Sequence, residues 1–216
     1  MGLLPWISKV RNRTWKHLRG GYVPRRFWEG WGDRFPRLGF QREIYAGQRW
    51  LLERLRAHAG APILEVGCGF GRNLDYLARN LGPGGTLWGL DISSKMLRQA
   101  RRELPAGCHL ACGDIQALPF PDGGFGLVFT HGVLMHVRPE SLASALAEIR
   151  RVSSSSFLFA EETYWPGLRK GDSLKLNDYT YIHDYAAILP REGFEIEEMG
   201  ESGEAVNMIL IRCRKK

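Results

Sequence analysis

The sequence predicts an α/β protein: a three-layer sandwich with a seven-stranded, mostly parallel sheet, preceded by an N-terminal helical or irregular extension. Three observations support this class. A strand-like run from Ile63 passes through alternating glycines, 67–71, into a helical run. Two further short strands end in Asp91 and Asp114, at spacings that suit successive strand–helix units. Two more strands are expected within residues 195–213, and we expect them to form a terminal hairpin in which one strand is antiparallel to the sheet.

Length and composition indicate one soluble domain with some decoration. The chain has 216 residues, with 44% hydrophobic and 25% charged residues, ordinary values for a globular protein. No apolar run approaches the roughly 18 residues that a membrane span needs, and residues 1–10 make a poor secretory signal. The four cysteines are scattered without metal-ligand spacing, which predicts reduced thiols. We therefore expect a cytoplasmic protein without a metal site.

The positive charge belongs to the N-terminal extension, which we place at residues 1–40, ahead of a main domain at 41–216. The formal net charge is +7, and the first 50 residues hold 11 Lys and Arg against 3 Asp and Glu. Residues 1–40 also hold four tryptophans, and their glycines and prolines allow only short helices, one of them from Pro5 to Leu18. Three interpretations stay open: a cap over the cofactor or substrate pocket, a nucleic-acid contact, or an anchor at an anionic membrane surface.

A helix is expected from Gln41 to His58, where apolar residues recur at helical spacing. The stretch Ile63–Asn73 follows, reading I-L-E-V-G-C-G-F-G-R-N. Glycine has no β-carbon and tolerates positive φ, so this turn lets a ligand approach the backbone at the start of the next helix, Asn73–Leu81. The spacing G-x-G-x-G differs from the G-x-G-x-x-G of dinucleotide-binding turns.

The stretch resembles the first motif of class I S-adenosylmethionine (SAM)-dependent methyltransferases, which have a Rossmann-like fold. In that family an acidic residue, here Glu65, precedes the first glycine by two places, and a small residue such as Cys68 is often found inside the turn. The resemblance implies SAM as cofactor, S-adenosylhomocysteine as product, and Glu65, Gly67, Cys68, Gly69 and Gly71 as cofactor contacts.

Two later acidic positions extend the resemblance. A carboxylate at the end of the second strand, Thr86–Leu90, can accept hydrogen bonds from both ribose hydroxyls of an adenosine; this implies Asp91 for the ribose and Ile92 against the adenine. Asp91 is alternatively a helix N-cap, since Ser93 and the helical run 95–104 follow. After the third strand, 110–113, the resemblance implies Asp114 beside the adenine amino group and Ile115 beside the ring.

The fourth strand, Phe125–Phe129, leads into the region expected to face the methyl acceptor. The family usually has an Asp just inside this strand, where Gly126 stands here. The resemblance implies that Thr130 and His131, just past the strand, lie beside the methionine end of SAM. His131 and His136 are candidate general bases, because imidazole titrates near neutral pH; His136 is alternatively a cap of the next helix, 140–151.

Beyond that helix we expect a polar turn at Ser153–Ser156, a fifth strand at Phe157–Ala160, a helix at 186–192, and strands at 195–199 and 206–213. Residues 163–185 have the least regular pattern, and in the resembled fold this segment helps form the acceptor pocket. Its candidate substrate contacts are Tyr164, Trp165, Tyr179, Tyr181 and His183; a surface loop packed on the sheet is the alternative.

The expected function is methyl transfer from SAM to an oxygen, nitrogen or carbon nucleophile of a small-molecule acceptor. Two other functions stay open. One is methylation of a nucleic acid held by residues 1–40, and the other is a non-catalytic scaffold with the same fold. The motifs identify the methyl donor and not the acceptor.

Overall fold

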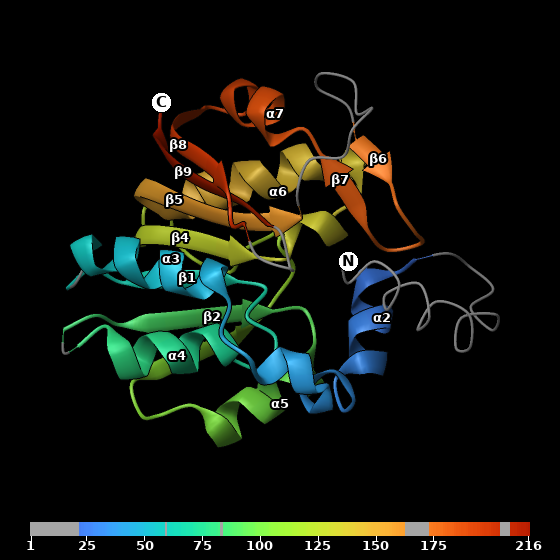
Figure 1. The fold of residues 1–216 in the computed structure, drawn as a ribbon, viewed down its shortest axis with the longest axis vertical. Coiled ribbons are helices and arrows are strands. Elements are labelled where there is room, and N and C mark those ends of the chain that lie inside the picture. Colours follow the sequence, from blue (N-terminus) through green and yellow to red (C-terminus); the bar gives the residue numbers. More distant parts are fainter. Residues whose placement is uncertain (1–21, 59, 83, 163–172, 204–207) are drawn as a thin grey trace.

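The computed structural model of the chain describes residues 22–58, 60–82, 84–162, 173–203 and 208–216. A seven-stranded sheet forms its centre, in the order β3-β2-β1-β4-β5-β9-β8 (Figure 1). Neighbours among β1 to β5 are parallel, and β9 runs antiparallel to β5 and β8. The strands are β1 (Ile63–Val66), β2 (Leu87–Asp91), β3 (Cys108–Cys112), β4 (Phe125–His131), β5 (Ser153–Glu162), β8 (Phe194–Glu201) and β9 (Met208–Lys215). The predicted fold class is confirmed.

Helices cover both faces of the sheet and complete the three layers. One apolar cluster joins α3 (Ala46–Leu55), α4 (Arg72–Asn80) and α5 (Ser94–Glu103) to one face. A second joins α6 (Pro139–Val152) and α7 (Tyr185–Arg191) to the other. The other helices of the described residues are α2 (Pro24–Trp31) and the 3-10 turns η1 (Phe35–Arg37), η2 (Gly39–Arg42), η3 (Arg56–His58) and η4 (Leu134–His136). Both sheet faces are apolar because a parallel sheet carries helices on each side.

The predicted helix over 41–58 is shorter than expected. Glu43 is extended, with φ −81° and ψ 151°, and α3 begins only at Ala46. A capping box sets this start, because the Tyr45 backbone N–H donates to Gln48 Oε1 at 2.9 Å. Gln41 and Arg42, at the start of the predicted helix, therefore belong to the separate 3-10 turn η2.

The predicted polar turn at Ser153–Ser156 is wrong, since these serines form the first four residues of β5. Ser153 pairs with Phe125 and Ser156 with Leu127, across a register irregularity in β4. Short hydroxyls fit a strand when they find partners, and Ser153 Oγ donates to the Ser156 carbonyl at 3.1 Å. The local bond satisfies the buried hydroxyl that the sequence pattern assigned to solvent.

The described part of the irregular segment 163–185 contains a small antiparallel hairpin. β6 (Ser173–Lys175) pairs with β7 (Tyr181–His183) outside the main sheet. In Figure 1 this hairpin lies at the same end of the molecule as α2, where the strands of the parallel sheet end. Within the described residues, no helix is long and apolar enough to cross a membrane.

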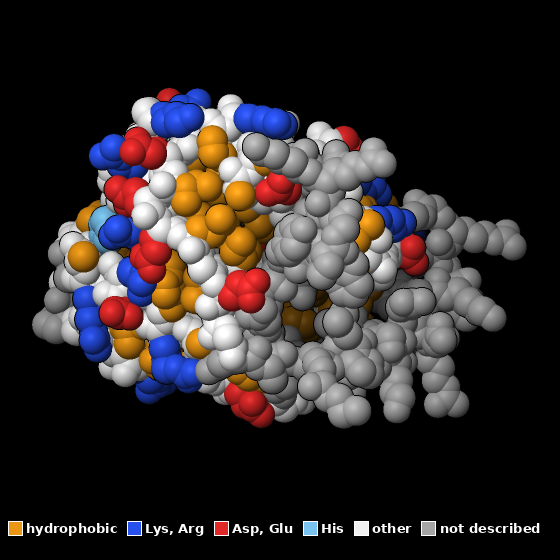
Figure 2. Space-filling model, turned by 45° about the horizontal axis from the view of Figure 1, so that its top comes forward, with side chains coloured by type: hydrophobic (Ala, Val, Ile, Leu, Met, Phe, Trp, Pro, Cys, Tyr) orange, Lys and Arg blue, Asp and Glu red, His pale blue; other side chains and the backbone are white. Residues whose placement is uncertain are grey.

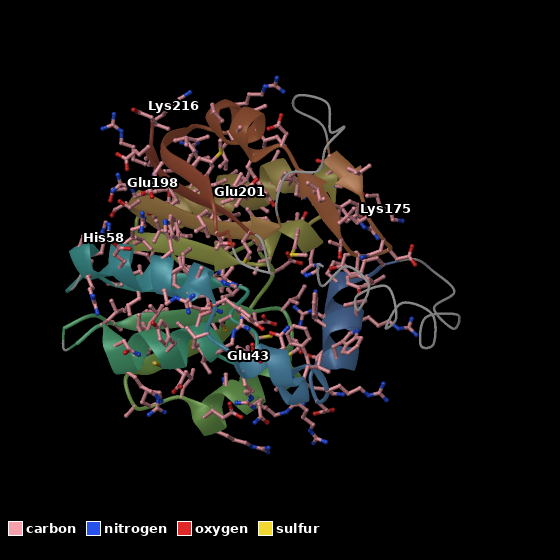
Figure 3. All side chains as sticks on the ribbon, viewed as in Figure 1. Glu43, His58, Lys175, Glu198, Glu201 and Lys216 are labelled. Atoms are coloured by element: carbon pink, nitrogen blue, oxygen red, sulfur yellow. The ribbon has the colours of Figure 1, made fainter. Side chains whose placement is uncertain are left out.

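The opposite end of the sheet carries paired charges. Glu198 on β8 accepts hydrogen bonds from Arg54 and Trp50 of α3, and it lies far from Lys175 on β6 (Figure 3). On the neighbouring surface, Arg214 pairs with Glu195 at 2.7 Å. Figure 2 shows acidic and basic side chains interspersed around an apolar area on this face. The excess of positive charge that marks the N-terminal segment therefore does not extend over the surface of β8 and β9.

Candidate functional site

The carboxyl ends of β1, β2 and β4 bring the predicted cofactor residues to one edge of the sheet. Val66 lies beside Leu90 on β2 and Thr130 on β4. The glycine turn after β1 is thus flanked by Asp91 on one side and His131 on the other. This is the edge at which ligands bind in open α/β sheets.

The glycine turn is shaped by both backbone conformation and packing. Gly67, Gly69 and Gly71 have φ of 78°, 56° and 87°, in the left-handed region. A β-carbon at Gly67 would lie 2.7 Å from Val133 Cγ1, and one at Gly71 would lie 3.1 Å from Leu104 Cδ1. At Gly69 a β-carbon would meet nothing within 4 Å. The turn therefore presents bare backbone to open space at its middle glycine.

The Asp91 side chain is hydrogen-bonded to this turn. Its Oδ2 accepts a hydrogen bond from the Gly69 N–H at 2.8 Å, and its Oδ1 accepts one from the Ser93 N–H at 2.8 Å. Burial raises the pKa of Asp91 to about 6 against the opposing effect of these two bonds. The N-cap of α5 is Ser93, whose Oγ accepts from the Met96 N–H at 3.2 Å. Each carboxylate oxygen of Asp91 keeps a further lone pair for a ligand hydroxyl.

The predicted adenine contacts lie next to Asp91. The Gly113 N–H donates to the Asp91 carbonyl at 3.1 Å, which joins the end of β3 to that of β2. Asp114 is partly exposed, and its Oδ1 accepts a hydrogen bond from the Gln116 N–H at 2.9 Å. Ile92 and Ile115 are both partly buried. The ends of β2 and β3, which carry these residues, are therefore neighbours at the same edge of the sheet.

Glu65 is buried beneath the turn, with 1% of its surface exposed. Asn73 Nδ2 donates to Glu65 Oε1 at 2.6 Å. Glu65 Oε2 is buried and has no hydrogen-bond partner among the described residues. Burial raises the pKa of Glu65 to about 8, opposed by the Asn73 bond and the charge of Arg72. Cys68, also buried in the turn, has its pKa raised by burial, so it is a neutral thiol.

Glu161, at the end of β5, organises the segment after β4, a role that the sequence analysis missed. Its Oε1 accepts from the Thr130 hydroxyl at 2.6 Å, and its Oε2 accepts from the backbone N–H groups of Val133 at 2.9 Å and Met135 at 3.3 Å. The side chain is fully buried, and burial raises its pKa to about 7. Glu161 thereby fixes the loop that packs on Gly67 and carries His136.

The two candidate bases differ in environment. Burial lowers the pKa of His131 to about 3, helped by the charge of Arg72. Its Nε2 is buried, without a hydrogen-bond partner among the described residues, and would lie 2.9 Å from a β-carbon at Gly47. His131 therefore faces the start of α3.

His136 is held in one tautomer. Its Nδ1 lies 2.8 Å from the Tyr179 carbonyl, which can only accept, so Nδ1 carries the proton and Nε2 has a free lone pair. Burial lowers its pKa to about 4. The Trp28 ring packs edge-on at 4.8 Å between centroids. A neutral imidazole with a defined acceptor nitrogen can act as a general base.

The predicted acceptor contacts divide into three groups. Tyr164 and Trp165 lie outside the described residues. Tyr179 packs at 4.5 Å from the Phe27 ring of α2, close to His136. Tyr181 and His183 are buried in β7. His183 Nδ1 lies 2.6 Å from Ser173 Oγ, and its Nε2 lies 3.1 Å from the Leu134 and Val137 carbonyls. Both nitrogens of His183 are used within the protein, so its role is to join β7 to η4.

Residues of the N-terminal segment also border the site. Glu29 of α2 accepts from the Ser94 N–H at 2.6 Å, at the first turn of α5. The Tyr22 hydroxyl donates to the His136 carbonyl at 3.1 Å. The described part of the extension thus contacts both the first turn of α5, which follows Asp91, and the segment that carries His136. Within the described residues there is no cluster of three or more His, Cys, Asp or Glu side chains suited to a metal.

Comparisons with known proteins show what the central segment is similar to. A family described as "Methyltransferase domain" matches residues 63–155. The chain is 43% identical over 105 residues to an uncharacterized 37.1 kDa protein in a transposon of Streptomyces fradiae, covering 47% of this chain and 30% of the relative. It is 38% identical over 108 residues to a malonyl-[acyl-carrier protein] O-methyltransferase of Erwinia pyrifoliae, covering 50% and 38%. The match thus spans well under two thirds of either relative.

A solved structure shares the fold. Magnesium protoporphyrin IX methyltransferase of Synechocystis, with bound S-adenosylhomocysteine, has a TM-score of 0.62 and 19% identity, covering 78% of this chain and 82% of that one. At this identity the likeness concerns the arrangement of helices and strands.

Proposed function

We propose that the chain transfers the methyl group of SAM to a small-molecule acceptor, and the match of residues 63–155 to a methyltransferase domain family supports this. The observation that carries the proposal is the pairing of Gly69 with Asp91. The Asp91 carboxylate is held at 2.8 Å from the backbone of a turn whose middle glycine faces open space. A ligand with a ribose diol and a chain lying along the turn fits both features.

The residues present fit SAM at both of its ends. On the adenosine side, Asp91 would accept from the ribose hydroxyls and Asp114 from the adenine amino group, with Ile92 and Ile115 against the ring. On the amino-acid side, Glu65 has a buried, unpartnered oxygen that suits an ammonium group. Gly67, Cys68, Gly69 and Gly71 would line the path between them, with Thr130 and His131 at its far wall.

When bound, SAM supplies an activated methyl group on a sulfonium. What this chain adds is position and a dry environment, in which an acceptor lone pair can reach the methyl carbon in line with the breaking C–S bond. For a protonated acceptor, His136 would take the proton at Nε2. The Tyr179 carbonyl supports this role because it holds the proton on Nδ1 and so keeps Nε2 free.

The acceptor would enter beside His136, between α2 and the β6–β7 hairpin. Tyr179, which is partly exposed, supplies aromatic surface there, and Tyr164 and Trp165 stay predicted contacts. A small molecule is favoured over a nucleic acid because charged residues on the described strands β8 and β9 are paired with opposite charges. A cytoplasmic location fits four unpaired cysteines, since reducing compartments keep thiols free.

The test uses SAM carrying a labelled methyl group. Purified protein is incubated with cell extract separated into small-molecule, nucleic-acid and protein fractions. We expect label in an extractable small molecule and its loss in Asp91→Ala. Label in nucleic acid would favour the nucleic-acid function. Absence of transfer to every fraction, together with tight SAM binding, would favour a non-catalytic scaffold.

A further inference from the structure

A buried chain of amides connects the start of α3 to Glu65. Gln48 and Asn73 are 1% and 6% exposed and lie on different helices. Gln48 Nε2 donates to Asn73 Oδ1 at 3.0 Å, and Asn73 Nδ2 donates to Glu65 Oε1 at 2.6 Å. Burying two amides costs free energy unless each polar atom is paired. Their burial beneath the glycine turn therefore calls for a reason beyond core packing.

The direction of every hydrogen bond in this chain is fixed by its first member. The Tyr45 backbone N–H can only donate, so the atom of Gln48 that it meets at 2.9 Å must be the oxygen. The Gln48 nitrogen then faces Asn73, whose oxygen must accept. The Asn73 nitrogen is left to donate to Glu65. All three donors point toward the carboxylate, and neither amide can turn over without breaking two bonds.

As a consequence, one oxygen of the Glu65 side chain accepts a hydrogen bond from the protein and the other is left for a ligand. Glu65 Oε1 receives the amide donor, while Oε2 is buried and has no partner among the described residues. The charged groups that act on Glu65 are Arg72 of α4 and Asp91 of β2, and Asn73 supplies its hydrogen bond. A cationic ligand group at Oε2 would complete the set.

We propose that Gln48 and Asn73 are positioning residues for the cofactor: they orient Glu65 so that its free oxygen meets the ammonium group of SAM. This rests on the proposed function and assigns a role to two residues outside the glycine turn. It also links the start of α3, where Gln48 closes the capping box, to affinity for the amino-acid end of the ligand. Neither residue touches the ligand in this account.

Two ligands distinguish a role in positioning Glu65 from a general role in stabilising the fold. S-adenosylhomocysteine has the amino-acid end, and 5′-methylthioadenosine lacks it. Isothermal titration would compare Gln48→Met and Asn73→Leu with the wild type. We expect about ten-fold weaker binding of S-adenosylhomocysteine in each variant, because a misoriented Glu65 would lose the equivalent of one hydrogen bond from the ammonium group of the ligand. Binding of 5′-methylthioadenosine should stay within two-fold of wild type.

Matched controls use the same substitutions elsewhere. Gln99→Met removes a helix glutamine that bonds Glu103, and Asn80→Leu removes an asparagine that bonds the Tyr76 carbonyl at the end of α4. Both should bind the two ligands as the wild type does. Gln48→Met is the milder change, since it leaves the hydrogen bond from Asn73 to Glu65 in place. It therefore still tests the proposal if Asn73→Leu fails to fold.

A double-mutant cycle gives the sharpest readout. In a Glu65→Gln background, Gln48→Met should cause no further loss of S-adenosylhomocysteine affinity, because the carboxylate that it orients is gone. Equal weakening of both ligands, or additive losses in the cycle, would overturn the positioning role while leaving the proposed function intact. If the wild type bound neither ligand, the proposed function would fail and this inference with it.

Discussion

Replacing Glu161 tests whether one buried carboxylate shapes the segment after β4. Glu161→Gln keeps the size of the side chain. Its oxygen can accept from the Val133 and Met135 N–H groups, and its nitrogen can donate to Thr130 Oγ. This arrangement mimics the protonated carboxyl. Glu161→Ala instead leaves three donors without an acceptor, each at a cost of about 1–3 kcal/mol.

The magnitude follows from the raised pKa. The ordinary value for the residue is 4.5 and the folded value is about 7. At roughly 1.4 kcal/mol per pKa unit, ionisation of Glu161 lowers the free energy of unfolding by up to about 3 kcal/mol. A folded pKa raised for an acid means that the folded state binds more protons between pH 4.5 and 7, so this stability is present at low pH and lost as pH rises.

Urea denaturation at pH 5 and pH 8 measures the difference. The wild type and Glu161→Gln should have similar stability at pH 5, and the variant should be more stable at pH 8 by up to about 3 kcal/mol. Glu140→Gln, an exposed change on α6, should show no such pH-dependent difference. Parallel stability curves for the wild type and Glu161→Gln across this range would refute the reasoning.

Three further predictions concern ligand and acceptor. Gly69→Ala should weaken S-adenosylhomocysteine binding at least ten-fold, whereas Gly123→Ala, also at positive φ in open space, should cost similar stability, roughly 1–2 kcal/mol, without affecting binding. His136→Asn should lower kcat about 100-fold for a hydroxyl acceptor while S-adenosylhomocysteine affinity, by titration, is unchanged. Trp28→Ala should raise KM for the acceptor more than KM for SAM in steady-state assays, because the ring packs on His136.

Each of these has a contradicting result. Equal binding by Gly69→Ala and Gly123→Ala would show that the turn does not hold the ligand. Full activity of His136→Asn with a hydroxyl acceptor would remove His136 as the base. An unchanged acceptor KM in Trp28→Ala would place the acceptor away from α2.

The sheet and the glycine turn could be predicted because their signals are local. Gly67, Asp91 and Asp114 lie at or within two residues of the ends of β1, β2 and β3, and parallel pairing brings such ends to one edge of the sheet. The observed strand boundaries differ by a few residues from the predicted ones where pairing with a neighbouring strand extends a strand, as in β5. Ser153–Ser156 joined β5 because β4 offered partners, which no local pattern of serines indicates.

The polar interior of the site could not be predicted in the same way, because its partners are distant in sequence. Glu161 and Thr130 lie 31 residues apart and meet only through the pairing of β4 with β5. The burial of Gln48 could have been predicted from the sequence. It lies on the same helical face as Leu51, Leu52 and Leu55, where a polar residue must find a buried partner. The identity of that partner, Asn73, required the packing of α3 on α4.

The central claim is that Asp91 and the glycine turn hold SAM. Isothermal titration of the wild type and Asp91→Ala with S-adenosylhomocysteine tests it most directly. We predict one binding site in the wild type and at least about 100-fold weaker binding in the variant, since two hydroxyl bonds to a charged group are lost. No binding by the wild type, or equal binding by Asp91→Ala, would contradict the account.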